Sequence, residues 1–235
     1  MPSSFDKKIE KEIPAVFYMF AGADDSEQAQ EVDNVGTFSL PDPAGKHGGA
    51  CTAALLQVVI NDEADDSIDY SWTETLALMR EKIEDIGLTS IPCLSSSRPI
   101  DVNETMKIVP DGYDGVRRAM LIGINYVGQK GELKACWNDT RNVKEFLMNT
   151  YDFKRENMLI LMDDGKHHMP TKQMIMDGFH KLVEISEPGD VVFIQFSGHG
   201  GQVVDVSGDE GDGFDEILWC GTLYRHYLDG FVLNA

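Results

Sequence analysis

The chain has 235 residues with 40 acidic and 20 basic side chains, and its formal net charge at neutral pH is −20. This length suffices for one large domain or two small ones with a packed core. The negative charge argues against a nucleic-acid-binding protein, because phosphates would be repelled. No apolar run approaches the length of a membrane-spanning helix, and the charged start lacks a signal-peptide core. We therefore expect a cytoplasmic protein that binds neither nucleic acid nor membranes.

The four cysteines have unrelated flanking residues, and no CxxC pair occurs among Cys51, Cys93, Cys136 and Cys220. This spacing indicates neither a zinc site nor a framework of disulfides. A reducing compartment such as the cytosol fits such cysteines.

The first half of the chain predicts a mixture of helices and short strands. In order we expect a charged tail (1–14), a strand (15–20), a long loop (to 49), a helix (50–60), a second helix (from 71), a short strand and turn (91–101) and a linker (102–116). Ser71 and Glu74 form a capping box, which marks the start of the second helix. The apolar residues of this helix recur at helical spacing and form one stripe: Trp72, Leu76, Met79, Ile83 and Ile86.

The second half alternates strands with helices. The predicted elements are a strand (118–124), a helix (137–148), a strand (158–162), a helix (172–185) with Thr171 as its N-cap, and a strand (190–196). Strands that alternate with helices imply right-handed crossovers and a mostly parallel sheet. The sequence therefore predicts an α/β fold.

The last of these strands, VVFIQF, runs directly into SGHGG at residues 197–201. The junction places His199 on a turn at the carboxyl end of a strand, where open α/β folds bind their ligands. Gly198 and Gly200 have no Cβ and would let a substrate approach the backbone closely. An imidazole can accept a proton near neutral pH, so His199 is a candidate general base. On spacing alone, the alternative is a polar turn that contains an incidental histidine.

The segments around this junction resemble those of a known family. In order, RRAMLIGINY, ELKACWNDTRNVKEFL, ENMLILMDD, SGHGG and GDEGDGFDE resemble the large-subunit region of the metacaspases, which are caspase-like cysteine endopeptidases. AGADDSEQAQ, GGACTAALL and IPCLSSSRPID resemble the small-subunit region of the same family. The small-subunit-like region (15–101) precedes the large-subunit-like region (117–216), an order that resembles the type III metacaspases of algae. Residues 217–235 match neither region and form an atypical tail.

The resemblance implies a caspase-like, mostly parallel sheet flanked by helices and a cysteine-histidine mechanism. By motif, His199 corresponds to the catalytic histidine, and the N–H of Gly200 corresponds to the donor that stabilises the oxyanion. The family's nucleophile lies in a segment like DSCHSG, which is absent here. We therefore expect a truncated form with an incomplete sheet that lacks the nucleophile and its strand. Cys220 lacks the following His-Ser-Gly and is a poor substitute, and Cys136 matches a non-catalytic position.

The resemblance also implies cleavage after Arg or Lys, with Asp139 and Ser197 as substrate-binding residues. A carboxylate facing a guanidinium gives a strong, charge-assisted hydrogen bond. The alternative for Asp139 is a carboxylate that interacts with the dipole of its own helix.

Many metacaspases are activated by calcium, and the acidic loop at 208–216 supplies the oxygen ligands that calcium prefers. The candidate metal ligands are Asp209, Glu210, Asp212 and Asp215. A solvated acidic loop without metal is the alternative interpretation.

Two further functions stay open at this point. The chain could be a catalytically inactive pseudo-protease that binds partners or regulates them. A small-molecule α/β enzyme is less well supported, because no phosphate-binding GxGxxG or Walker pattern opens a helix.

Overall fold

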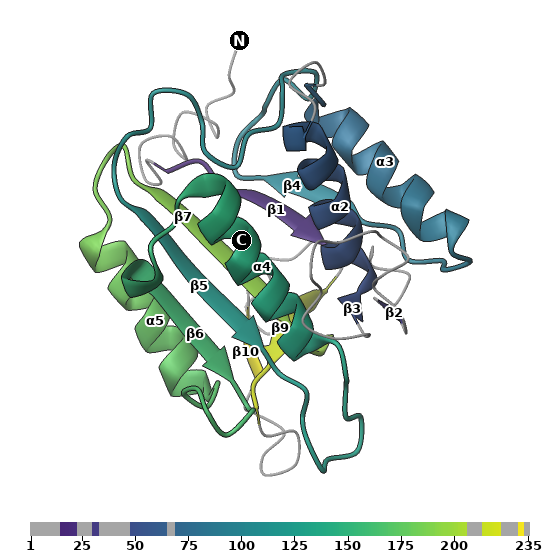
Figure 1. Ribbon diagram of the computed structural model, residues 1–235. Coiled ribbons are helices and arrows are strands. Elements are labelled where there is room, and N and C mark those ends of the chain that lie inside the picture. The colour runs from purple at the N-terminus through teal and green to yellow at the C-terminus, as the bar shows by residue number, and fades with distance from the viewer. Residues whose placement is uncertain are drawn as a thin grey trace. The chain divides into compact units, whose positions relative to one another are not determined.

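The computed structural model describes residues 15–22, 30–32, 48–64, 69–205, 213–221 and 230–232. These residues belong to two compact units (Figure 1). The first unit comprises residues 1–30, 37–39 and 50–107, and the second comprises 31–36, 40–49 and 108–235.

The first unit contains two helices and a small antiparallel sheet. Its elements are β1 (Tyr18–Ala21), α2 (Ala50–Ala64), α3 (Trp72–Asp85) and β4 (Cys93–Ser96), with β1 paired antiparallel to β4. The predicted capping box is confirmed: the Ser71 hydroxyl accepts the N–H of Glu74, and the Glu74 carboxylate accepts the N–H of Ser71. Gly87 follows α3 with a φ of +78°, a conformation that favours glycine and ends the helix.

The second unit is built on a parallel sheet of three strands. β5 (Arg117–Gly123) lies between β6 (Met158–Met162) and β7 (Val191–Ser197), and both pairings are parallel. Two helices connect these strands: α4 (Cys136–Tyr151) and, after the short 3-10 turn η2 (Arg155–Asn157), α5 (Lys172–Ile185). α5 begins at the predicted N-cap, since the Thr171 hydroxyl accepts the N–H of Met174.

α4 and α5 cover opposite faces of this sheet (Figure 1). A Cβ on Gly123 would collide with Thr140 of α4, whereas a Cβ on Gly178 of α5 would lie 2.7 Å from the Met120 side chain. Gly123 and Met120 are an odd number of residues apart on β5 and therefore point to opposite sides. The apolar cluster on the α5 side consists of Met120, Ile122, Ile124, Tyr126, Leu161, Ile175, Leu182 and Cys220.

Short antiparallel strands complete the second unit. β8 (Gly200–Val204), β9 (Phe214–Trp219) and β10 (Gly230–Val232) form one sheet in the order β10-β9-β8. β2 (Glu31–Val32) and β3 (Gly48–Gly49) form a two-stranded ribbon.

These short strands differ from the sequence-based expectation. Asp215 and Glu216, expected in a loop, lie in β9, and the tail that matched neither subunit region contributes β10. Cross-strand pairing, rather than a long apolar pattern, makes these segments strands, so their sequences carry little local signal.

The predicted fold class is confirmed: the chain is an α/β protein with a parallel sheet flanked by helices, consistent with a caspase-like fold. In the part of the chain that the structure describes, β7 pairs with β5 alone within the parallel sheet. No helix among these residues combines the length and apolar character needed to cross a membrane.

Candidate active site

The candidate site lies at the carboxyl ends of the three parallel strands. Asn125 and Tyr126 follow β5, Asp163 follows β6, and His199 follows β7. Because parallel strands end at the same edge of a sheet, residues far apart in sequence meet there.

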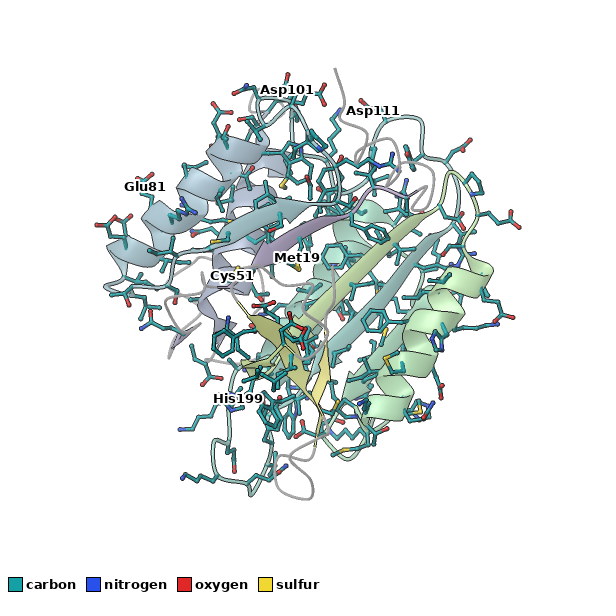
Figure 2. All side chains as sticks on the ribbon, turned by 180° about the vertical axis from the view of Figure 1, so that it is seen from behind. Met19, Cys51, Glu81, Asp101, Asp111 and His199 are labelled. Atoms are coloured by element: carbon teal, nitrogen blue, oxygen red, sulfur yellow. The ribbon has the colours of Figure 1, made fainter. Side chains whose placement is uncertain are left out.

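His199 lies between β7 and β8, as predicted, with a half-buried ring (Figure 2). Its Nε2 atom lies 2.6 Å from the carbonyl oxygen of Gly131. A carbonyl can only accept a hydrogen bond, so Nε2 carries the hydrogen, and in the neutral ring Nδ1 keeps the lone pair. The ring is therefore oriented with Nδ1 as its basic nitrogen.

Tyr126 contacts both the backbone and the ring of His199. Its hydroxyl oxygen accepts the N–H of His199 at 2.9 Å and donates to the carbonyl of Trp219 at 2.8 Å. The two rings are in contact, with centroids 4.9 Å apart. Burial raises the pKa of Tyr126, which keeps the phenol protonated and able to donate. This residue thus connects the histidine turn to β9.

The two glycines that flank His199 differ in the space around them. A Cβ on Gly198 would lie 2.8 Å from the ring of Phe196 and 2.9 Å from the hydroxyl of Tyr126. The absence of a Cβ at Gly198 therefore makes room for the protein's own side chains. Gly200 is exposed, and a Cβ there would meet only the carbonyl of Ile217 at 3.6 Å.

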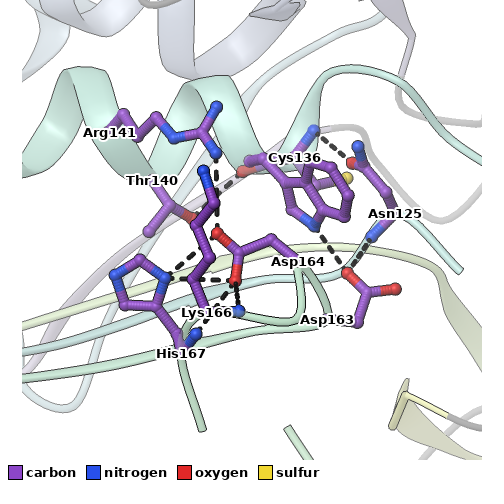
Figure 3. Close-up of polar contacts among 9 residues, drawn as sticks. Asn125, Cys136, Thr140, Arg141, Asp163, Asp164, Lys166 and His167 are labelled. Atoms are coloured by element: carbon purple, nitrogen blue, oxygen red, sulfur yellow. Dashed lines mark hydrogen bonds and ion pairs between the residues drawn. The ribbon is translucent and has the colours of Figure 1, made fainter. Parts of the chain in front are cut away.

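Asp163 holds the loop that carries Tyr126. Its Oδ1 accepts the N–H of Asn125 at 2.9 Å and the indole N–H of Trp137 at 2.6 Å (Figure 3). Its Oδ2 accepts the N–H of Tyr126 at 2.7 Å. The side chain of Asn125 in turn accepts the N–H of Cys136 at the start of α4. Tyr126 has a φ of +54°, a strained conformation for a side-chain-bearing residue, and these bonds hold it in place.

The next residue, Asp164, closes the loop after β6. Its carboxylate accepts the N–H groups of Lys166 and His167, contacts Nδ1 of His167 at 3.1 Å, and lies 3.6 Å from the guanidinium of Arg141 (Figure 3). Burial opposes ionisation of Asp164, but these N–H donors and the imidazole outweigh it, so its pKa lies below the usual value. His167 thus has a structural partner in this loop.

Asp139 and Ser197, predicted to act together, are in contact. Asp139 lies in the first turn of α4 and is only 3% exposed. Its Oδ2 accepts the hydroxyl of Ser197 at 2.8 Å, and its Oδ1 accepts the N–H of Gly49 in β3, also at 2.8 Å. The Ser197 hydroxyl accepts a further hydrogen bond from the side chain of Gln195 at 2.7 Å.

The electrostatics of Asp139 are dominated by burial. Loss of hydration raises its pKa to about 7, although the donors Gly49 and Ser197 act in the opposite direction. Near neutral pH the group therefore exchanges between a neutral and a charged form. The charged form suits a cationic ligand.

Neither cysteine of the second unit is presented as a nucleophile. Cys136 is 4% exposed, and burial raises the pKa of its thiol well above the ordinary value. Cys220 is 2% exposed and belongs to the apolar cluster under α5. Both placements agree with the prediction that these thiols are not catalytic.

The predicted metal ligands are only partly within the described residues. Asp209, Glu210 and Asp212 lie outside them, whereas Asp215 lies in β9 and is buried. Across the ranges that the structure describes, no group of three or more His, Cys, Asp or Glu side chains is arranged to hold a metal ion.

Sequence reasoning did not find Tyr126, Asp163 or the carbonyl of Gly131 as parts of this site. Asp163 had a usable signal, because it directly follows the buried strand β6 in the segment MLILMDD. Tyr126 acts through a hydroxyl that contacts residues more than 70 positions away, and Gly131 acts through a backbone oxygen, so residue types alone do not reveal either role.

Comparison of the sequence with known proteins points to one family. The family profile described as metacaspase, peptidase C14 domain, matches residues 117–225. The chain is 43% identical over 216 residues to Metacaspase III c of Phaeodactylum tricornutum, and this alignment covers 91% of this chain and 64% of that protein. It is 50% identical over 107 residues to Metacaspase-1 of Pyricularia oryzae, which covers 45% of this chain and 27% of that protein.

A solved structure of protein GSU0716 from Geobacter sulfurreducens has 25% sequence identity and a TM-score of 0.37, with 50% of this chain and 42% of that chain covered. This score is too low to carry an argument. The alignment with Metacaspase III c is longer than the segment that matches the family profile. Residues 117–225 of the chain match the metacaspase family, and its similarity to Metacaspase III c extends over 91% of the chain.

Proposed function

We propose that this chain contributes the histidine and the basic-residue pocket of a calcium-stimulated cysteine endopeptidase that cleaves after Arg or Lys. The chain spans 64% of the length of Metacaspase III c and 27% of that of the Pyricularia relative. The observation that carries the proposal is the orientation of His199, whose Nε2 is engaged by Gly131 and whose Nδ1 remains basic.

In this mechanism Nδ1 of His199 takes the proton of a cysteine thiol, and the thiolate attacks the peptide carbonyl. The proton then passes to the leaving amine. The exposed N–H of Gly200 stabilises the oxyanion, which requires a distance of about 3 Å from the developing charge. The 235 residues contain no Asp-x-Cys-His-Ser-Gly segment that would supply this thiol.

Recognition of Arg or Lys is assigned to Asp139 together with Ser197. Charged Asp139 attracts a guanidinium or ammonium group, and its lone pairs suit the fork of an arginine. Because Asp139 is 3% exposed, a cation reaches it only after neighbouring groups move. Its pKa of about 7 makes cation binding weaken as the pH falls below neutrality, where the carboxyl group becomes protonated.

Calcium is assigned to the acidic segment of the β8–β9 hairpin. The backbone bond from Asp205 N–H to the carbonyl of Gly213 holds the two ends of this segment together. Asp209, Glu210, Asp212 and Asp215 would supply hard oxygen ligands there. Calorimetric titration with calcium, compared with the Asp212→Asn variant, tests this assignment independently of catalysis.

The test of the main proposal is hydrolysis of fluorogenic peptides with Arg, Lys or Asp before the cleaved bond, with and without millimolar calcium. The proposal expects turnover of the Arg and Lys peptides that His199→Ala abolishes. Turnover that survives His199→Ala, or a preference for the Asp peptide, would contradict it.

The burial of Cys136 and Cys220 favours a second candidate, a pseudo-protease that binds basic peptides without cleaving them. A folded chain that binds Arg peptides but shows no turnover would support this function over the first. For either function we propose a cytosolic protein with protein or peptide partners and no nucleic-acid partner, in line with the net charge of −20.

A further inference from the structure

The Asp139 carboxylate accepts one hydrogen bond on each of its oxygens. Gly49 donates its backbone N–H to Oδ1, and Ser197 donates its hydroxyl to Oδ2, both at 2.8 Å. An ionised carboxylate offers about four lone-pair positions, so about one on each oxygen remains for another donor. Once the neighbouring groups move, these lone pairs could accept a two-point contact from one cation.

Gly49 is a glycine for a steric reason. Its φ is not in the left-handed region, so the backbone conformation does not demand glycine. A Cβ at this position would lie 2.5 Å from Oδ2 of Asp139 and 3.4 Å from its Cγ. The same oxygen accepts the Ser197 hydroxyl, so an added methyl group would compete with Ser197 for one side of the carboxylate.

The strand that carries Gly49 is fixed to the helix that carries Asp139. In the β2–β3 ribbon, Glu31 pairs with Gly49. Oε1 of Glu31 accepts the N–H groups of Lys134 and Ala135 at 3.0 and 2.8 Å, just before α4. Ala135, the N-cap of α4, makes no side-chain cap bond, and Glu31 accepts the N–H groups of this residue and of the one before it. The ribbon is thus attached to the start of α4 at two points.

We propose that Gly49 is a positioning residue that determines the specificity of the cation pocket. Its N–H and its missing side chain hold Asp139 on Ser197 in the orientation that an arginine or lysine side chain needs. This inference rests on the proposed role of Asp139 in recognition. It adds a backbone donor, 90 residues away in sequence, to that role.

The test measures binding rather than catalysis, so it needs no nucleophile. N-acetyl-arginine amide and its uncharged analogue N-acetyl-citrulline amide are titrated into the chain at pH 8, followed by NMR. The wild-type chain should prefer the arginine ligand, and Asp139→Asn should abolish that preference. Gly49→Ala keeps the backbone N–H, but its methyl group crowds the oxygen that accepts the Ser197 hydroxyl. It should therefore lower the preference about tenfold or more, the effect of losing that charge-assisted hydrogen bond.

The outcomes separate the two claims. If Asp139→Asn keeps the arginine preference, both the proposed recognition and this inference are wrong. If Asp139→Asn loses the preference while Gly49→Ala retains it in full, recognition by Asp139 stands and the role of Gly49 is refuted. Equal weakening of both ligands in Gly49→Ala would indicate a merely structural role and would also refute it.

A double-mutant cycle covers the case in which Gly49→Ala folds poorly. If the methyl group acts through the carboxylate, Gly49→Ala should lower the melting temperature of the wild-type chain but not that of Asp139→Ala, where the space is free. An equal loss of melting temperature in both backgrounds would overturn the inference.

Discussion

Replacing Asp139 by Asn should change how the stability of the protein depends on pH. Burial raises the pKa of this carboxyl group to about 7 in the folded chain, whereas an unfolded Asp titrates near 4. Between these two values the folded state binds more protons than the unfolded state, so stability falls as the pH rises. Asn stays neutral at every pH and removes this dependence.

The magnitude follows from the difference of about three pKa units. At a pH above both values the buried charge costs about 4 kcal/mol, and at pH 5 it costs about 1.5 kcal/mol. The stability of Asp139→Asn relative to the wild-type chain should therefore improve by about 2.5 kcal/mol between pH 5 and pH 8. Asn still accepts the N–H of Gly49 through its oxygen, but its amide faces the Ser197 hydroxyl. That mismatch costs about 1 kcal/mol at every pH and leaves the slope unchanged.

The assay is urea unfolding at a series of pH values, followed by the fluorescence of Trp137 and Trp219, which both lie in the second unit. Trp72 of the first unit is changed to Phe in all samples. Glu184→Gln is the control, because Glu184 is an exposed carboxylate paired with Lys181. A difference between Asp139→Asn and wild type that stays constant from pH 5 to pH 8 would refute the buried-charge reasoning.

Three further changes test the support of His199. Tyr126→Phe removes the hydroxyl that accepts the backbone N–H of His199 and donates to the carbonyl of Trp219 in β9. It should lower the free energy of urea unfolding by about 1–3 kcal/mol. Tyr113→Phe, at an exposed position, is the control and should leave this free energy unchanged. Gly198→Ala should destabilise by about 1–3 kcal/mol because its Cβ collides with the ring of Phe196 and the hydroxyl of Tyr126. Gly200→Ala should leave the melting temperature unchanged, and equal effects of the two changes would contradict the steric reasoning. Asp163→Ala leaves the N–H groups of Asn125, Tyr126 and the Trp137 indole without their acceptor. It should lower the free energy of unfolding by about 2–4 kcal/mol and shift the indole N–H signal of Trp137 in NMR spectra. An unmoved indole signal would argue against this network.

Most of the regular elements could be predicted from local sequence. The helix α5 and the strand β6 have the predicted limits, 172–185 and 158–162. The start of α3 was also predictable, because a capping box consists of side chains only three residues apart. The strands β5 and β7 were found to within one residue at each end, since long apolar runs between turns are strong signals.

The short strands could not be predicted in the same way. β3 consists of two glycines and β8 opens with two, and glycine is unfavourable in isolated strands. They are strands because each pairs with a neighbouring strand, β3 with β2 and β8 with β9. More than a dozen residues separate β2 from β3 in the chain. Local propensity carries no information about such pairing.

By itself, the amino-acid sequence determined the alternation of helices and strands, the position of His199 at the end of a strand, and the likeness to the metacaspases. These depend on neighbouring residues, whose periodicity and spacing are visible in one dimension. Only the tertiary structure decided that Tyr126, Asp163 and Gly131 support His199, and that Gly49 holds Asp139 against Ser197. Those contacts join residues between 37 and 90 positions apart. The contacts of Tyr126, Asp163 and Gly131 arise because parallel strands bring distant loops to one edge of a sheet, whereas Gly49 reaches Asp139 in α4 from the β2–β3 ribbon.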